Sequence, residues 1–323
     1  HVRVYQWSGE NWEQLGANIN GEAFGDYSGS SVSLSSDGSI LAIGAPLNNN
    51  DNGIDSGHVR IYQWSGTSWV QIGTDIDGES PYDESGGSVS LSSDGSKVAI
   101  GAVGSDGNGI DSGHVRVYQW SGTTWTQLGD DIDGEAFGDF FGSSVSLSSN
   151  GTSVAIGAPL NINDNGIESG HTRVFHWSGE AWDQLGADID GESPYDESGR
   201  SVSLSSNAKR LVIGAEKNDG NGFDSGHVRV YQWSGENWVQ LGTDIDGESP
   251  NDASGRLAAL SADGNRVAIG AGRNDSNGFD AGHVRIWDLS MFNVFNINAG
   301  LNDAWYDPET DGQGFFITVF PDL

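Results

Sequence analysis

The chain has 323 residues and carries 46 acidic against 14 basic side chains, a formal net charge of −32. A surface this acidic repels nucleic acid phosphates and anionic lipid headgroups, so we expect neither as a partner, whereas cations are attracted to it. Cysteine is absent, which excludes disulfides and thiolate metal sites. No apolar run approaches the ~20 residues of a membrane-spanning helix.

One segment of the sequence recurs six times, and each copy is marked by a histidine. Successive histidines are separated by 57, 56, 57, 56 and 56 residues: His1, His58, His114, His171, His227 and His283. The repeats cover about residues 1–290, which we expect to form one domain because each repeat buries its faces on its neighbours. The tail, 291–323, is a possible closing hairpin or the start of a separate unit. Because His1 lies in mid-repeat, we expect a processed form or a fragment.

Residues 30–87 show the predicted strands of one repeat. Residues 31–35 alternate small polar with apolar side chains, which is a strand pattern, and an Asp-Gly turn leads to a short apolar strand at 40–45. After a loop rich in Asn, Asp and Gly, a third strand is expected at 59–64 and a fourth at 69–72. An acidic link, 74–86, leads to the next repeat.

Four antiparallel strands at a constant period predict an all-β fold, a β-propeller of four-stranded blades. A stacked β-solenoid is the alternative, but its repeats are usually shorter and lack hairpins. Six blades are favoured, from five repeats closed by the terminal segments, with five or seven as alternatives. In the six-bladed arrangement a tail hairpin over residues 305–320, turning at Asp311-Gly312, pairs with residues 1–22. A further tail strand is expected at 292–297.

The residues Phe24-Gly25, Ser31-Val32-Ser33-Leu34 and Ile43-Gly44-Ala45-Pro46 resemble the FG-GAP repeat of integrin α-chain propellers, and most closely its bacterial and algal variant. Phe137-Gly138 and Ile156-Gly157-Ala158-Pro159 repeat the pattern. The resemblance covers about 290 residues and implies an extracellular propeller that binds calcium in its blade loops and recognises other macromolecules. In the family the calcium loop joins the first two strands. Here that link is only Ser-Asp-Gly-Ser, so the site is not carried over to it.

The second–third loops have the shared form Asp/Asn-x-Asn-Gly-apolar-Asp/Glu. Oxygen ligands at positions 1, 3 and 6 suit a hard cation such as calcium. Asx-turns with glycine at positive φ are the alternative explanation of the same residues. The candidate metal ligands are Asn50, Asn52, Asp55, Asp106, Asn108, Asp111, Asn163, Asn165, Glu168, Asp219, Asn221, Asp224, Asp275, Asn277 and Asp280.

Acidic side chains are concentrated at one end of the predicted blades. Consecutive hairpins place the second–third loops and the inter-blade links on one face, which receives 32 of the 46 acids, against 8 on the other face. The link acids, such as Asp75, Asp77 and Glu79, could bind a second cation. We favour instead a bidentate ion pair with the repeated arginines of the third strands, which need a partner between blades. The six repeated histidines look architectural, because a catalytic histidine need occur only once.

These observations favour an extracellular or cell-surface, non-catalytic binding or adhesion module, stabilised by calcium, whose ligand is an extracellular protein or a glycan. A purely structural surface or matrix component is one alternative. A carbohydrate-active enzyme is the other, although no nucleophile–base–orienter set assembles in the sequence. Five aromatic residues in the links, Tyr27, Tyr82, Phe140, Phe141 and Tyr195, are expected either to stack on sugars or to pack between blades. The oligomeric state is left open.

Overall fold

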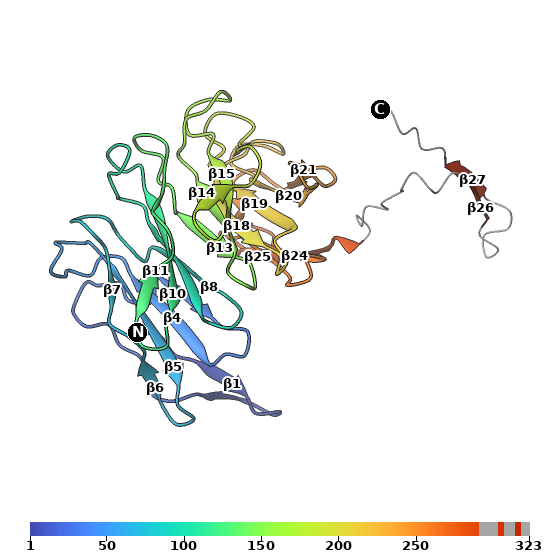
Figure 1. The fold of residues 1–323 in the computed structure, drawn as a ribbon. Coiled ribbons are helices and arrows are strands. Elements are labelled where there is room, and N and C mark those ends of the chain that lie inside the picture. Colours follow the sequence, from blue (N-terminus) through green and yellow to red (C-terminus); the bar gives the residue numbers. More distant parts are fainter. Residues whose placement is uncertain (291–302, 307–313, 318–323) are drawn as a thin grey trace. The chain divides into compact units, whose positions relative to one another are not determined.

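The computed structural model describes residues 1–290, 303–306 and 314–317. The chain divides into two units, His1–Asp288 and Leu289–Leu323. The regular elements of the described residues are β-strands, which confirms the predicted all-β class. In the first unit, antiparallel sheets follow one another in chain order, from blue to orange in Figure 1.

Four blades are complete, and each has strand order first, second, third, fourth, with a two-residue strand that pairs beside the start of the third. Blade 1 comprises β3 (Ser31–Leu34), β4 (Ile40–Ala45), β5 (His58–Trp64), β6 (Trp69–Gln71) and β7 (Ile76–Asp77). Blade 2 comprises β8 (Ser88–Leu91), β9 (Lys97–Ala102), β10 (His114–Trp120), β11 (Trp125–Gln127) and β12 (Ile132–Asp133). Blade 3 comprises β13 (Ser144–Leu147), β14 (Ser153–Ala158), β15 (His171–Trp177), β16 (Trp182–Gln184) and β17 (Ile189–Asp190). Blade 4 comprises β18 (Ser198–Leu204), β19 (Arg210–Ala215), β20 (His227–Trp233), β21 (Trp238–Gln240) and β22 (Ile245–Asp246).

Within the described residues, the blades at the two ends of the repeat array have fewer than four strands. The N-terminal pair is β1 (Tyr5–Trp7) with β2 (Trp12–Gln14), and blade 5 comprises β23 (Ser254–Leu260), β24 (Arg266–Ala271) and β25 (His283–Asp288). In the second unit, β26 (Asp303–Tyr306) pairs antiparallel with β27 (Gly314–Ile317), a pair that overlaps the tail hairpin predicted at 305–320 and begins two residues earlier. Its turn and the strand expected at 292–297 lie outside the described residues. Closure of six blades by this tail stays a prediction.

The strands predicted for residues 30–87 are confirmed to within a residue or so. The prediction was wrong in the link, which was expected to be loop throughout. Ile76 pairs with Val59 and Asp77 with His58, so the link begins as the short strand β7. The alternation rule missed it because two residues are too few to show a period.

A glycine in each second strand allows the blades to approach closely. In β19, a Cβ added at Gly214 would overlap the carbonyl oxygen of Gly255 in blade 5 and lie 2.6 Å from the Oγ of Ser201. Gly44, Gly101 and Gly157 meet the corresponding carbonyl of the next blade in the same way. The glycine of the Ile-Gly-Ala motif is therefore fixed by backbone contact between blades.

Serine and tryptophan side chains join each blade to its neighbour. The Oγ of Ser201 donates to the carbonyl of Gly255 at 2.9 Å, and the Oγ of Ser203 accepts the amide of Leu260 at 3.0 Å. Trp238 Nε1 donates backwards to the carbonyl of Leu185 at 3.0 Å. Between these contacts the second and third strands bury apolar side chains of both blades, for example in the cluster around Leu211 and Ile213.

Blade 5 departs from this scheme on the side away from blade 4. Leu257 and Ala259 stand where blade 4 has Ser201 and Ser203. Leu257 is 73% exposed, and Val284 and Ile286 of β25 are 67% and 72% exposed. The equivalent third-strand residues of blade 4, Val228 and Val230, are buried.

Candidate functional site

The second–third loops proposed as calcium sites lie against the inter-blade links. At position 3, the side-chain amides of Asn52, Asn108, Asn165 and Asn221 donate to the carbonyls of Gly78, Gly134, Gly191 and Gly247, at 2.7 to 2.8 Å. These bonds hold both acidic segments on one face, as the hairpin rule predicted.

In three of the five loops, a hydrogen bond joins positions 1 and 6. The Oδ1 of Asp106 accepts the amide of Asp111 at 3.0 Å, and the pairs Asp219–Asp224 and Asp275–Asp280 repeat this contact at 2.9 and 2.7 Å. In two loops the first residue is asparagine, and its Oδ1 accepts a serine hydroxyl at 2.6 Å and the amide of position 3: Asn50 with Ser56 and Asn52, and Asn163 with Ser169 and Asn165.

The residue at position 6 is left-handed in every copy, with φ between 48° and 54°: Asp55, Asp111, Glu168, Asp224 and Asp280. The Asx-turn chemistry that was the alternative explanation is therefore present. Calcium ligation by the same residues, including Asn277, stays a prediction.

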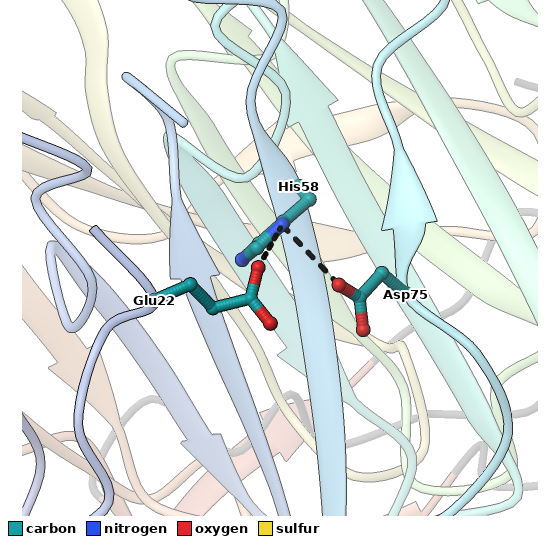
Figure 2. Close-up of side chains that lie close together, drawn as sticks. All are labelled: Glu22, His58 and Asp75. Atoms are coloured by element: carbon teal, nitrogen blue, oxygen red, sulfur yellow. Dashed lines mark ion pairs between the residues drawn. The ribbon is translucent and has the colours of Figure 1, made fainter. Parts of the chain in front are cut away.

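A second group of acids meets the repeated histidine between two blades. In Figure 2, Glu22 from the preceding link and Asp75 from the following link flank His58 at the start of β5. The Nδ1 atom of His58 lies 3.6 Å from Asp75 Oδ2 and 4.0 Å from Glu22 Oε2. The cluster recurs in the next three blades: Glu79, His114 and Asp131; Glu135, His171 and Asp188; Glu192, His227 and Asp244.

The glutamate of each cluster also pairs with the arginine two residues after the histidine. Arg116 Nη1 lies 3.2 Å from Glu79 Oε1, and its Nη2 donates to the backbone carbonyl of Asp77 at 2.8 Å. The predicted arginine–carboxylate pair is thus present, but its bidentate form was wrong. One guanidinium nitrogen is taken by a carbonyl. In the clusters of His58, His171 and His227, the second glutamate oxygen lies 3.9 to 4.0 Å from the histidine Nδ1.

Burial sets the protonation state of the histidines. Burial first, and the neighbouring arginine second, lowers the pKa of His171 and of His227 to about 4, despite the opposing effect of Asp188 and Asp244. The pKa of Glu192 is raised, mainly by burial. At neutral pH the imidazoles are therefore uncharged, which is the form that can ligate a metal ion.

Each cluster offers one imidazole nitrogen and two carboxylate oxygens within 4.8 Å of one another, so each could hold a metal ion. The sequence indicated these residues only separately. The glutamate precedes the histidine by 35 or 36 residues and the aspartate follows it by 17 in all four copies. This constant spacing is the signal in the sequence for the cluster. The place where the three side chains meet also depends on the short strands in the links, such as β7, which were predicted to be loop.

Of the aromatic residues in the links, some are exposed and one packs between blades. Tyr27, Tyr82 and Tyr195 are 68%, 59% and 54% exposed. Phe141 is fully buried, and its ring packs edge-on against Phe175. Phe141 is therefore a packing residue between blades, while the tyrosines face solvent.

The fold and the repeated cluster define a propeller-type repeat protein. An FG-GAP repeat family model matches residues 188–231, which form β17, β18, β19 and most of β20, so the chain carries an FG-GAP repeat as its sequence pattern indicated. No curated protein sequence matches the chain.

Two solved structures share the propeller-like fold. Hydrazine synthase of Kuenenia stuttgartiensis is 14% identical with a TM-score of 0.53, and the match covers 80% of this chain and 64% of that one. A putative 6-phosphogluconolactonase of Bacteroides uniformis is 13% identical with a TM-score of 0.54, over 88% of this chain and 76% of that one. At these identities the likeness concerns the fold alone. Within the described residues no helix has the length and apolar character needed to cross a membrane.

Proposed function

We propose that the protein is a non-catalytic binding module of the extracellular space or cell surface, and that calcium stabilises it. The observation that carries the proposal is a row of exposed apolar side chains on the acidic face. They occupy the same loop position in five blades and are 50% to 90% exposed: Ile54, Ile110, Ile167, Phe223 and Phe279.

A repeated apolar position surrounded by carboxylates supports recognition rather than folding. Exposed apolar side chains gathered on one face of a soluble protein are typical of interaction sites. Because each blade presents the same position, the face suits an extended or multivalent ligand that contacts several blades at once. Its charge favours a basic protein segment or a neutral glycan over an anionic polymer.

The binding function is tested by screening the chain on a glycan array and against extracellular matrix proteins. We expect a ligand whose affinity falls at least tenfold in Phe223→Ser. Val239→Ser is the matched control, because Val239 is 52% exposed in β21, outside these loops. Binding that is equal in both variants contradicts the assignment of this face.

The calcium part of the proposal rests on the acids of the second–third loops. Each loop supplies about three side-chain oxygens besides carbonyls and water, which suits six- or seven-fold coordination with a dissociation constant on the order of 10⁻⁴–10⁻³ M. Calcium of that affinity is bound only where it is abundant, hence the proposed extracellular location. Binding to the folded state alone raises stability by RT ln(1 + [L]/Kd) per site.

We expect the melting temperature to rise with millimolar calcium and to fall on chelation. Asp111→Ala is expected to remove one site's share of that rise and leave the remainder. If EDTA leaves the melting temperature unchanged at low and moderate salt, the loops serve turn formation alone. Staining of unpermeabilised cells tests the location, and a signal found only after permeabilisation contradicts it.

A further inference from the structure

The cluster between blades 3 and 4 differs from the other inter-blade clusters in its histidine. His227 is 1% exposed, and its Nδ1 atom has no hydrogen-bond partner among the described residues. That atom lies 3.9 Å from Glu192 Oε2 and 3.9 Å from Asp244 Oδ2. Both distances are too long for a hydrogen bond, so a buried polar atom points between two carboxylates without contacting either.

A pocket of about 700 Å³ opens beside this cluster, and Glu192 and Asp244 are among the residues that line it. Five carboxylate residues line it, and no lysine or arginine is among the described residues that do so: Glu192, Asp196, Asp219, Asp244 and Asp246. Carboxylates held this close repel one another, and a bound cation relieves that repulsion.

Arg229 is the basic side chain that pairs with Glu192, and its contacts leave one oxygen of Glu192 available. Its Nη1 lies 3.6 Å from Glu192 Oε1, while its Nη2 donates to the carbonyl of Asp190 at 2.7 Å and to Ser198 Oγ at 3.3 Å. The guanidinium is therefore held on the other oxygen of Glu192, and Oε2 faces His227. One oxygen of Asp244 is likewise occupied, because Gln240 donates to Oδ1 at 2.7 Å. The other oxygen, Oδ2, is the one that faces His227.

The donor set decides between cations. Calcium and magnesium take oxygen ligands, whereas imidazole with carboxylates suits zinc and other first-row divalent metals. In a tetrahedral zinc site with bonds of about 2.1 Å, neighbouring donors lie about 3.4 Å apart. The two 3.9 Å separations need to shorten by about 0.5 Å, which is within reach of partly exposed carboxylates. Water in the pocket supplies the fourth ligand.

We propose that Glu192, His227 and Asp244 form a zinc site between blades 3 and 4, separate from the calcium loops. Among the described histidines, His227 is the one whose Nδ1 is both buried and without a hydrogen-bond partner. In blade 2, His114 Nδ1 is hydrogen-bonded to Ser105 Oγ at 2.9 Å. In blade 5, His283 faces only Glu248, at 3.7 Å, among the described residues. Zinc here ties the link before blade 4 to its third strand and to the link that follows.

The site is tested by titrating the full chain with zinc. The buffer contains millimolar calcium, which occupies sites made of oxygen ligands only. His227→Gln is expected to bind one zinc ion fewer than the wild type, while His283→Gln, at the equivalent but incomplete position, is expected to bind the same number. The X-ray absorption edge of zinc in the wild type should show a single imidazole among oxygen ligands.

Asp244→Asn provides a second variant if His227→Gln fails to fold, because its amide oxygen can still accept the bond from Gln240. We expect it to weaken zinc binding at least tenfold. The proposal is overturned if calcium displaces all bound zinc, if both variants retain the wild-type stoichiometry and affinity, or if the absorption edge shows oxygen ligands alone. None of these results bears on ligand binding by the exposed apolar row.

Discussion

The contact between the backbones of blades 4 and 5 makes Gly214→Ala the most informative substitution. The added methyl group would overlap the carbonyl oxygen of Gly255 and lie 2.9 Å from its carbonyl carbon. Since the overlapping atoms belong to the backbone of Gly255 and not to a flexible side chain, relief requires the blades to separate. Overpacking of this kind costs about 1–3 kcal/mol. Separation also stretches the Ser201–Gly255 hydrogen bond, which contributes about 1 kcal/mol more.

We therefore expect a loss of about 3 kcal/mol, which for a body of this size lowers the melting temperature by roughly 6–12 °C. Gly270→Ala is the matched control. It lies at the same position of β24, but the nearest atom to its added methyl, the carbonyl oxygen of Leu257, is 3.5 Å away. That distance is ordinary contact, and the change should stay within about 0.5 kcal/mol.

Both variants are compared by thermal melting in one buffer, with hydrogen exchange to locate any loosening between blades 4 and 5. The reasoning fails if Gly214→Ala melts together with Gly270→Ala. It also fails if exchange accelerates uniformly along the chain and not at β19 and β23, because the proposed strain is local.

Three further predictions concern single side chains. Arg229→Lys keeps the charge but cannot bond both Glu192 and the Asp190 carbonyl, so we expect a loss of about 1–2 kcal/mol in chemical denaturation; Arg3→Lys, at an exposed arginine just before the N-terminal pair β1–β2, should be neutral. Trp238→Phe removes the hydrogen bond to Leu185 and should cost about 1 kcal/mol, whereas Trp12→Phe, at a side chain 69% exposed, should leave the melting temperature unchanged. His171 has a pKa lowered by burial from 6.5 to about 4, so the unfolded chain binds its proton first and stability is lost as pH falls from about 6.5 to about 4. Between pH 7 and 5 this loss is on the order of 2 kcal/mol of unfolding free energy. His171→Gln should remove that part of the pH dependence of the unfolding free energy, measured by chemical denaturation in chelator; an unchanged pH dependence in this variant contradicts the argument.

The blade could be predicted from sequence because its signals are local. Side chains that alternate along residues 31–35 and an Asp-Gly turn are read within one hairpin, and the structure places β3 and β4 there. The Ile-Gly-Ala glycine was visible too, but not its cause. The atom that requires glycine at position 44 belongs to Gly86, in the next repeat.

The inter-blade cluster could not be predicted as a unit, because its parts come from two links and a strand. Whether Glu22 reaches Asp75 depends on how one blade is rotated against the next, and a single repeat does not encode that rotation. The same limit applies to Phe141, which is buried where the other links have serine, while Tyr82 in the preceding link is exposed. The sequence is compatible with both stacking on sugars and packing between blades, and only the position of the neighbouring blade decides between them.

The serines that join blades also give the array a direction. A second copy of blade 4 inserted directly after blade 4 would form the hydrogen bonds with Ser201 and Ser203 of the original blade. Its own copies of these serines would face blade 5, as they do now. A copy placed after repeat 5 would instead face Leu257 and Ala259, which have no hydroxyl to offer to its backbone. Repeats that look interchangeable by their motifs are therefore directional, and the fifth lacks the two serines with which the preceding blades bind the next one.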